Sequence, residues 1–224
     1  MLKREEKIQS MLKAIYNEAA YTHGLTGRQH FSDRVMEAMR NVPRDAFVPE
    51  NMKSHAFENR PLPIGEGQTI SQPYIVAYML QALKLNKDER VLEIGTGSGY
   101  AAALLAEIVK EVYTIEKIEK LAFKARKVLK ELNYQNVEVE IGDGSLGWEE
   151  KAPYDAVLVS AAAPYVPENL IEQLANKGRI IIPIGERGGI QQLKLFTKKY
   201  NGKIKEESLE YVRFVPLLGE DSWR

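Results

Sequence analysis

The residues best placed to do chemistry begin with a glycine-rich turn directly after an apolar run. Residues 91–99 read VLEIGTGSG, so a β-type run leads into three glycines at alternate positions and then into a helical pattern. Glycines let the backbone turn sharply and approach a ligand closely, and the amides of a helix N-terminus face that ligand. A tight turn without a ligand needs fewer glycines. The pattern therefore predicts a nucleotide-type binding turn at Gly95, Gly97 and Gly99.

The spacing of these glycines separates two classes of cofactor. A dinucleotide fingerprint reads G-x-G-x-x-G, whereas this chain reads G-x-G-x-G and carries an acidic residue two positions before the first glycine. The pattern resembles the first motif of class I S-adenosylmethionine methyltransferases and argues against a dehydrogenase. The resemblance implies that S-adenosylmethionine is bound by Glu93, Gly95, Thr96, Gly97, Ser98 and Gly99.

Acidic residues also follow the next two expected strands. Glu116 lies 21 positions after Gly95, and a carboxylate at that strand end can accept hydrogen bonds from both hydroxyls of a ribose. Without the glycine turn, Glu116 would equally suit a solvated strand-end charge. The third strand ends in Gly142-Asp143-Gly144, where the methyltransferase pattern has an Asp that meets the adenine amino group. The resemblance thus implies that Asp143 and Gly144 bind the cofactor, although Gly-Asp-Gly is also an ordinary turn.

These features identify a cofactor and leave the substrate open. A more specific signal is residues 60–73, which read RPLPIGEGQTISQP. This run resembles the protein-L-isoaspartate (D-aspartate) O-methyltransferase family, and the resemblance extends over most of residues 35–224 through residues 42–49, 153–162, 178–185 and 214–219. It implies a repair enzyme that methylates the free α-carboxylate of L-isoaspartyl residues in damaged proteins and peptides.

The resemblance also assigns residues to the substrate side. Ser71 matches the family's catalytic-site serine, Thr69 lies at the substrate carboxylate, and Val212 and Phe214 match the strand that grips the peptide backbone. A carboxylate with a pKa near ~4 is already ionised at pH 7, so the transfer requires position and dryness and no general base. The Ser71 hydroxyl can bond one carboxylate oxygen and leave the other aimed at the methyl group. Alternatively, Ser71 caps the helix that begins near Pro73, and the two roles can coexist.

A scaffold must bring these residues together. Apolar side chains at helical spacing predict helices over residues 3–22, after Ser32 and after Pro73, with an ordered, largely irregular layer over residues 43–73. Further along, the pattern predicts strands at residues 90–94, 112–115, 137–141, 156–160 and 179–184, and helices at residues 98–109, 118–132 and 168–174. Short runs such as residues 157–159 and 180–182 are apolar on both faces, as in a buried parallel sheet.

This alternation predicts an α/β fold with a doubly wound, mainly parallel seven-stranded sheet, the class I methyltransferase fold. Asn201-Gly202, between β-type runs at residues 193–198 and 209–214, predicts a C-terminal antiparallel hairpin. We expect a single methyltransferase domain over residues 1–224. Residues 1–84 would supply an N-terminal helical cap and substrate-side layer over the carboxyl ends of the strands, and residues 85–224 the cofactor-binding sheet.

Composition narrows the class of function. Lys plus Arg and Asp plus Glu both total 31, and this zero net charge argues against a large nucleic-acid-binding face. The chain has no cysteine, and its histidines (His23, His30 and His55) lack metal-ligand spacing, so we expect no metal. No run approaches the ~20 apolar residues of a membrane span, and the charged N-terminus lacks the apolar core of a signal peptide. We therefore expect a cytoplasmic protein with neither a nucleic acid nor a membrane as partner.

Two rival functions remain. One is a methyltransferase of the same fold that acts on a small molecule or RNA; the neutral charge and the run GQTISQP at residues 67–73 argue against it. The other is a non-catalytic domain that binds S-adenosylmethionine or a nucleotide. An intact Ser71 beside intact cofactor motifs argues against that alternative.

Overall fold

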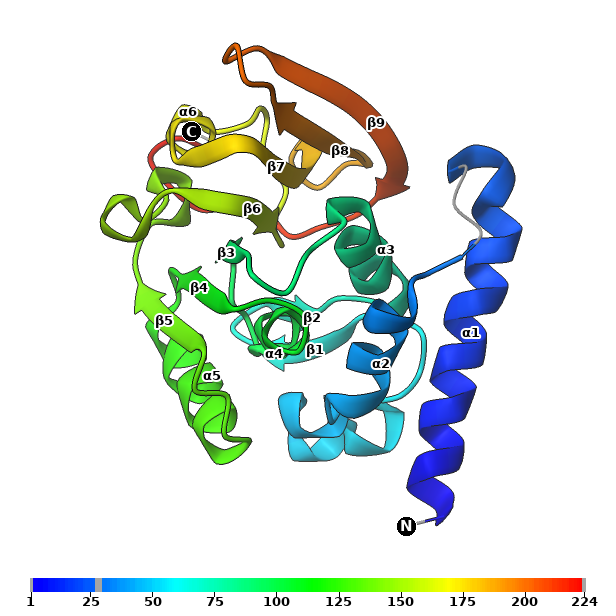
Figure 1. The fold of residues 1–224 in the computed structure, drawn as a ribbon. Coiled ribbons are helices and arrows are strands. Elements are labelled where there is room, and N and C mark those ends of the chain that lie inside the picture. Colours follow the sequence, from blue (N-terminus) through cyan, green and yellow to red (C-terminus); the bar gives the residue numbers. More distant parts are fainter. Residues whose placement is uncertain (1, 27–29, 223–224) are drawn as a thin grey trace.

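The computed structural model describes residues 2–26 and 30–222, and its N-terminal part is mainly helical (Figure 1). Helices α1 (Leu2–Thr26) and α2 (Asp33–Asn41) come first, followed by 3-10 helices at Arg44–Phe47 and Glu50–His55. Helix α2 has the expected cap, because the Ser32 side chain accepts a hydrogen bond from the Val35 amide. A small antiparallel hairpin of strands β1 (Leu62–Gly65) and β2 (Gln68–Ile70) then leads to α3 (Pro73–Leu83).

The remainder alternates strands and helices before it ends in strands alone. In chain order its elements are β3 (Arg90–Ile94), α4 (Tyr100–Ala106), β4 (Glu111–Glu116), α5 (Glu119–Glu131), β5 (Val137–Ile141), β6 (Tyr154–Val159), α6 (Glu168–Glu172), β7 (Leu174–Gly185), β8 (Gln191–Lys198) and β9 (Ile204–Val212). Two short 3-10 helices, Gly144–Leu146 and Glu149–Lys151, lie between β5 and β6.

The seven long strands form one sheet in the order β5-β4-β3-β6-β7-β8-β9. The first five strands in this order, from β5 through β4, β3 and β6 to β7, pair in parallel. Strands β8 and β9 are antiparallel to their neighbours, which confirms the predicted fold and the C-terminal hairpin. The chain runs outward from β3 to β5 and then returns to the other side of β3 with β6. This reversal makes the carboxyl ends of β3, β4 and β6 the place where an open sheet binds its ligands.

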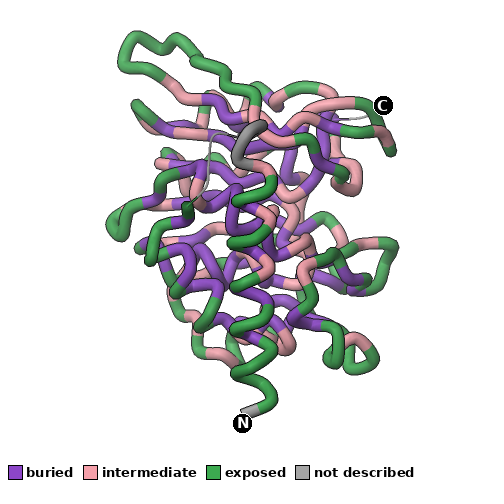
Figure 2. Tube along the Cα trace, turned by 90° about the vertical axis from the view of Figure 1, so that its right-hand side faces the viewer, coloured by how far each residue is buried: buried purple, intermediate pink, exposed green. Residues whose placement is uncertain are grey.

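Alternate residues of each strand point into two separate cores. Val91 and Leu158 pack with helices α1 to α5 on one face, while Leu92 and Val157 pack with α6 and Leu217 on the other. Figure 2 shows these buried residues gathered in the interior, with exposed residues along the outer side of α1. The first core draws on residues 1–84 as well as 85–224, which supports the single domain that we propose.

Several expected boundaries differ from the structure. The helix expected at residues 98–109 is limited to Tyr100–Ala106, and the last strand ends at Val212 and so does not include Phe214. Strand β7 begins at Leu174, so the preceding helix, expected to reach that residue, stops at Glu172. The layer over residues 43–73 contains two 3-10 helices and the β1–β2 hairpin.

The N-terminal helices cap a face of the sheet, and among the described residues α1 and α2 contribute nothing to the cavities at the strand ends.

Candidate functional site

A cavity of about 800 Å³, its open mouth included, lies at the carboxyl ends of the central strands. The glycine turn, the ends of β4 and β6, residues 68–71 and residues 215–218 enclose it. Of the residues predicted to bind a cofactor, the cavity is lined by Glu93, Gly95, Thr96, Gly97, Ser98, Glu116 and Gly144.

The glycine turn depends on backbone conformations that other residues avoid. Gly95 and Gly97 have φ values of 89° and 54°, in the left-handed region where a side chain is strained. Gly99 also has a positive φ, but it is the N-cap of α4 and its α-carbon faces Ala125 and Leu129 of α5. Gly99 therefore shapes the turn from behind and does not line the cavity.

Glu116 holds this turn in place. Its Oε2 accepts a hydrogen bond from the Gly97 amide and its Oε1 accepts one from the Ile118 amide, both at 2.8 Å. The side chain is buried at the cavity wall. A carboxylate oxygen has two lone pairs, so each oxygen retains acceptor capacity after these bonds. Glu116 thus fits the expected ribose contact and also connects β4 to the turn that follows β3.

Glu93 comes just before the turn, and its carboxyl group ends a short hydrogen-bonded chain of two threonine hydroxyls. The Thr114 hydroxyl donates to Glu93 Oε2 at 2.6 Å, and the Thr96 hydroxyl lies 2.6 Å from that of Thr114. Burial raises the pKa of Glu93 to about 8, against the opposing effect of the Thr114 hydrogen bond. Glu93 Oε1 is buried without a hydrogen-bond partner among the described residues. A buried polar atom at a cavity wall calls for a hydrogen-bond partner, and a bound cofactor is one source of that partner.

Asp143 is hydrogen-bonded to other protein groups through both of its carboxylate oxygens. Its oxygens accept hydrogen bonds from the amide and hydroxyl of Ser145, the amide of Glu220 and the ammonium of Lys117. Burial acts to raise the pKa of Asp143, but these donors lower it in net terms. Gly144 lines the cavity and Asp143 does not. In this arrangement Asp143 fastens the tail segment, residues 213–222, to the loop after β5.

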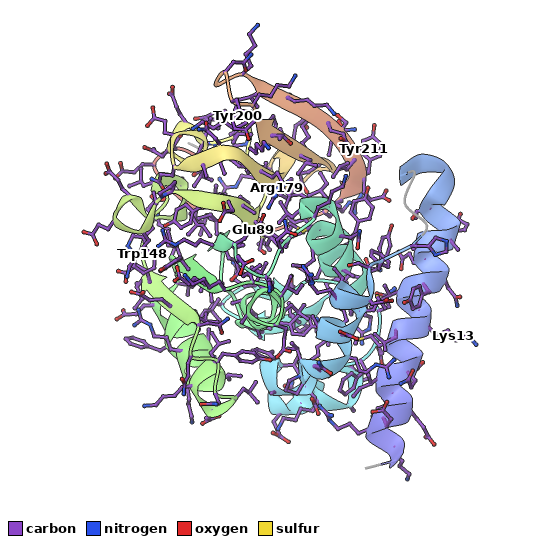
Figure 3. The ribbon with its side chains drawn as sticks, viewed as in Figure 1. Lys13, Glu89, Trp148, Arg179, Tyr200 and Tyr211 are labelled. Carbon is purple, nitrogen blue, oxygen red and sulfur yellow. The ribbon has the colours of Figure 1, made fainter. Side chains whose placement is uncertain are left out.

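A second cavity, of about 950 Å³ with its open mouth, adjoins the first. It contains all four predicted substrate-side residues: Thr69, Ser71, Val212 and Phe214. Figure 3 shows Tyr211 at the end of β9, and this exposed residue lines the same cavity. The two cavities share Thr69, Ser71, Ser160 and Val215, so these residues mark the boundary between them.

Ser71 is half-buried at this boundary and its hydroxyl bonds no other described residue. The helix-cap alternative does not hold for this residue, because the N-cap of α3 is Gln72 and the Tyr74 amide in the first turn donates to Asn59 instead. Thr69, two residues earlier, is exposed in β2. A donor hydroxyl is therefore available at the junction of the two cavities.

Several residues that line or support the cavities were not predicted from the sequence. Ser160 follows β6, and the rule that ligands meet the ends of parallel strands could have found it. Gln191 is buried and its Oε1 accepts the Phe214 amide at 2.8 Å, which fixes the start of the tail segment. Pro216, Leu217 and Leu218 complete the wall of the first cavity. No local pattern marks Gln191, because its role depends on a residue 23 positions away.

Three further observations concern metal ligands, membrane-spanning helices and the histidines. Among residues 2–26 and 30–222, no cluster of three or more His, Cys, Asp and Glu side chains could hold a metal ion. No helix within that part of the chain combines the length and apolarity needed to cross a membrane. His30 and His55 are exposed, and the side chain of His23 lies outside the described residues.

Comparisons with known proteins agree with this geometry. The family model described as protein-L-isoaspartate(D-aspartate) O-methyltransferase matches residues 19–222, starting inside α1. A Marinobacter nauticus protein-L-isoaspartate O-methyltransferase 2 is 54% identical over 190 residues, which are 85% of this chain and 87% of the relative. The corresponding Pelobacter propionicus protein is 52% identical over 92% of both chains.

Solved structures give the same result. A protein-L-isoaspartate O-methyltransferase with 28% identity superposes with a TM-score of 0.81, over 94% of this chain and 67% of the other. A Plasmodium falciparum protein assigned to the same enzymes was solved in complex with S-adenosyl-L-homocysteine. It has a TM-score of 0.75 and 28% identity, over 92% of this chain and 97% of the other.

Proposed function

Because this chain belongs to the protein-L-isoaspartate(D-aspartate) O-methyltransferase family, we propose how its own residues carry out that family's reaction. The enzyme transfers a methyl group from S-adenosylmethionine to isoaspartyl residues of damaged proteins, which is a repair activity. The observation that carries the proposal is the junction of the two cavities, where the unbonded Ser71 hydroxyl belongs to both.

The first cavity is the cofactor site. Glu116 would bind the ribose hydroxyls through the remaining lone pairs of its carboxylate, and the turn at Gly95 and Gly97 lets the cofactor approach the backbone closely. Glu93, whose Oε1 is buried and unpartnered, would form a hydrogen bond with the cofactor. When bound, S-adenosylmethionine supplies a methyl group made electrophilic by its sulfonium. Asp143 and Gly144 remain our predicted adenine contacts, with Gly144 at the cavity wall.

The second cavity is the substrate groove. The free carboxylate of an isoaspartyl residue is ionised at neutral pH, so the enzyme has only to hold and desolvate it. Ser71 would donate its hydroxyl to one carboxylate oxygen, which leaves the other directed toward the cofactor site, and Thr69 would bind the same group from β2. Val212 and Phe214 would hold the peptide backbone, supported by the Gln191 bond to the Phe214 amide.

One assay tests this proposal against the rival substrates. Transfer from methyl-labelled S-adenosylmethionine would be measured to matched isoaspartyl and aspartyl peptides, with an RNA of similar length as control. We expect transfer to the isoaspartyl peptide at a rate at least about a hundredfold higher, because a displacement of about 1 Å at a reacting group can cost that much. Equal rates on the two peptides would refute the substrate assignment, and methylated RNA would favour the rival substrate. A cytoplasmic location is a further proposal, which cell fractionation tests.

A further inference from the structure

Helix α1 takes no part in lining the cavities, yet one of its side chains reaches the segment that carries the substrate-side residues. Glu18 Oε2 accepts a hydrogen bond from the Asn59 side-chain amide at 2.6 Å and another from the Gln72 side-chain amide at 2.9 Å. The three residues are half-buried. Two donors therefore meet on one carboxylate oxygen, although they lie 41 and 54 positions from Glu18 in the sequence.

These two donors stand at opposite ends of one segment. Residues 60–71, here called the substrate-side segment, contain the β1–β2 hairpin, Thr69 and Ser71. Asn59 comes directly before this segment and Gln72 directly after it. A single oxygen atom of Glu18 thus holds both ends together, and the end held by Gln72 is adjacent to Ser71.

Two further bonds connect the same point to α3. Asn59 Oδ1 accepts a hydrogen bond from the Tyr74 amide at 2.9 Å, so Asn59 joins α1 to the first turn of α3. The Thr22 and Tyr74 hydroxyl groups lie 2.7 Å apart, one turn of α1 beyond Glu18. Helix α3 packs on the sheet within the first core, which also contains Val91 and Leu158. The clamp therefore fixes the substrate-side segment relative to the sheet that carries the cofactor site.

We propose that Glu18 is a positioning residue for methyl transfer, because its carboxylate clamps both ends of the substrate-side segment and so sets the place of Ser71 relative to the methyl donor. The inference rests on the proposed role of Ser71. Glu18 itself touches neither cavity in the described structure, so its effect passes through Gln72 and Asn59. Loss of the clamp would displace Ser71 by a fraction of an ångström or more, and displacements near 1 Å can cost about a hundredfold in rate.

The test compares two substitutions at Glu18 with a control elsewhere on α1. Glu18→Ala removes the acceptor, whereas Glu18→Gln retains a carbonyl oxygen that can accept from both amides. Arg4→Gln is the control, since Arg4 makes a two-pronged ion pair with Asp45 that fastens α1 far from Ser71. For each protein we would measure kcat and KM on an isoaspartyl peptide, S-adenosylhomocysteine affinity by calorimetry, and thermal unfolding.

We expect Glu18→Ala to lower kcat/KM for the peptide at least about tenfold, with cofactor affinity within about twofold of wild type. Glu18→Gln should remain within about threefold of wild type, and Arg4→Gln should lose stability only. Gln72→Met supplies a second route if Glu18→Ala does not fold, because α3 has no side-chain cap to lose. In the double-mutant cycle, the Glu18→Ala and Gln72→Met effects should be less than additive, because each substitution removes the same hydrogen bond.

Two failures are distinguishable. If the wild-type protein transfers no methyl group to the isoaspartyl peptide, the proposed function is wrong and the clamp falls with it. If wild type is active and a folded Glu18→Ala or Gln72→Met protein keeps wild-type kcat/KM, only the clamp is wrong. An equal loss in Arg4→Gln, or cofactor affinity that falls in step with kcat/KM, would show that α1 contributes general stability alone and would overturn the inference.

Discussion

The Gly97 amide donates a hydrogen bond to the Glu116 carboxylate across 2.8 Å, so the acidic end of β4 holds the glycine turn that follows β3. The other oxygen of the same carboxylate accepts the Ile118 amide and fixes the start of α5. A residue predicted only as a ribose ligand therefore also maintains the shape of the cofactor site. Substitutions at Glu116 should affect ligand affinity and local structure together.

Glu116→Ala should weaken binding of S-adenosylmethionine and S-adenosylhomocysteine by roughly ten- to a hundredfold. The substitution removes charge-assisted hydrogen bonds worth about 1.5–3 kcal/mol, and each 1.4 kcal/mol is a factor of ten. Calorimetric titration measures the loss. Glu119→Ala is the matched control, since Glu119 carries the same charge but is exposed in the first turn of α5. Unchanged affinity in Glu116→Ala would place the ribose elsewhere.

Glu93 should make the stability of the cofactor-free enzyme depend on pH. Burial raises its pKa to about 8 in the folded state, whereas an unfolded Glu titrates near ~4.3. The folded protein therefore binds this proton more tightly than the unfolded chain does. The resulting contribution of Glu93 to the free energy of unfolding is complete below about pH 4 and is lost as pH rises through about 8. Its slope is at most about 1.4 kcal/mol per pH unit.

Glu93→Gln removes this titration and serves as the reference. The free energy of unfolding should be measured for both proteins from pH 5 to 9 without cofactor. We expect the wild-type value to fall relative to that of Glu93→Gln up to about pH 8 and to run parallel above it. Parallel curves over the whole range would mean that Glu93 ionises normally in the folded protein.

Much of the sheet could be predicted from local pattern. Strands β3 and β5 are predicted to the residue: β3 is a short, largely apolar run ended by a glycine turn, and β5 alternates apolar and acidic residues, as a half-exposed strand does. The β1–β2 hairpin was missed, since its strands are short, one contains Pro63, and Gly65, Glu66 and Gly67 all have positive φ. Helix α4 is shorter than predicted because Ile108 and Val109 continue the apolar pattern as buried residues beyond the helix.

The site was predictable where one motif supplies both residue type and place. The glycine turn, Glu116 and Ser71 all lie at the cavities. Contacts across long stretches of sequence were not predictable: Thr114 reads as an ordinary strand residue, yet its hydroxyl bonds Glu93. The same holds for Asp143, whose partner Glu220 lies 77 positions away. Pairings of this kind depend on the tertiary fold, which brings the partners together.

Ser71→Ala should reduce turnover on the isoaspartyl peptide and leave cofactor affinity nearly intact. The hydroxyl has no partner among the described residues and caps no helix, so its removal should cost little stability. A lost cap would instead lower stability by about 1 kcal/mol. Kinetics and thermal unfolding on the same preparation measure both effects. A stable Ser71→Ala protein with wild-type turnover would exclude the proposed role of the hydroxyl.

Gly219→Ala should weaken cofactor binding through the tail segment. A β-carbon at Gly219 would collide with the Asp143 carboxylate and the Ser145 hydroxyl, so these side chains or the tail would have to shift. Either shift disturbs the hydrogen bonds that the Glu220 and Asp221 amides donate to these two side chains. Pro216 to Leu218 line the cofactor cavity and would move with it. We expect S-adenosylhomocysteine affinity to fall about tenfold, as measured by calorimetry.

Gly142→Ala is the control for the tail, because the new β-carbon would meet only the Ile115 side chain, at 3.8 Å, and φ at Gly142 is not positive. It should bind S-adenosylhomocysteine nearly as wild type does. Equal affinities in Gly219→Ala and Gly142→Ala would show that the position of the tail does not govern the cofactor site.

The rate of ester formation should be independent of a protein base. The acceptor carboxylate has a pKa near ~4, so at saturating cofactor the initial rate should fall only below about pH 4–5 and stay level between pH 6 and 8. His30 and His55, the described histidines, line neither cavity. Saturating cofactor keeps Glu93 from affecting this rate profile, because ionisation of Glu93 would act on cofactor binding.

Initial rates should be measured from pH 4 to 9 with rapid trapping of the ester, alongside circular dichroism to verify folding at low pH. A rise in rate with a midpoint between pH 6 and 8 would indicate an acceptor that must first lose a proton, such as an amine or a base nitrogen, and would favour the rival substrates over a carboxylate.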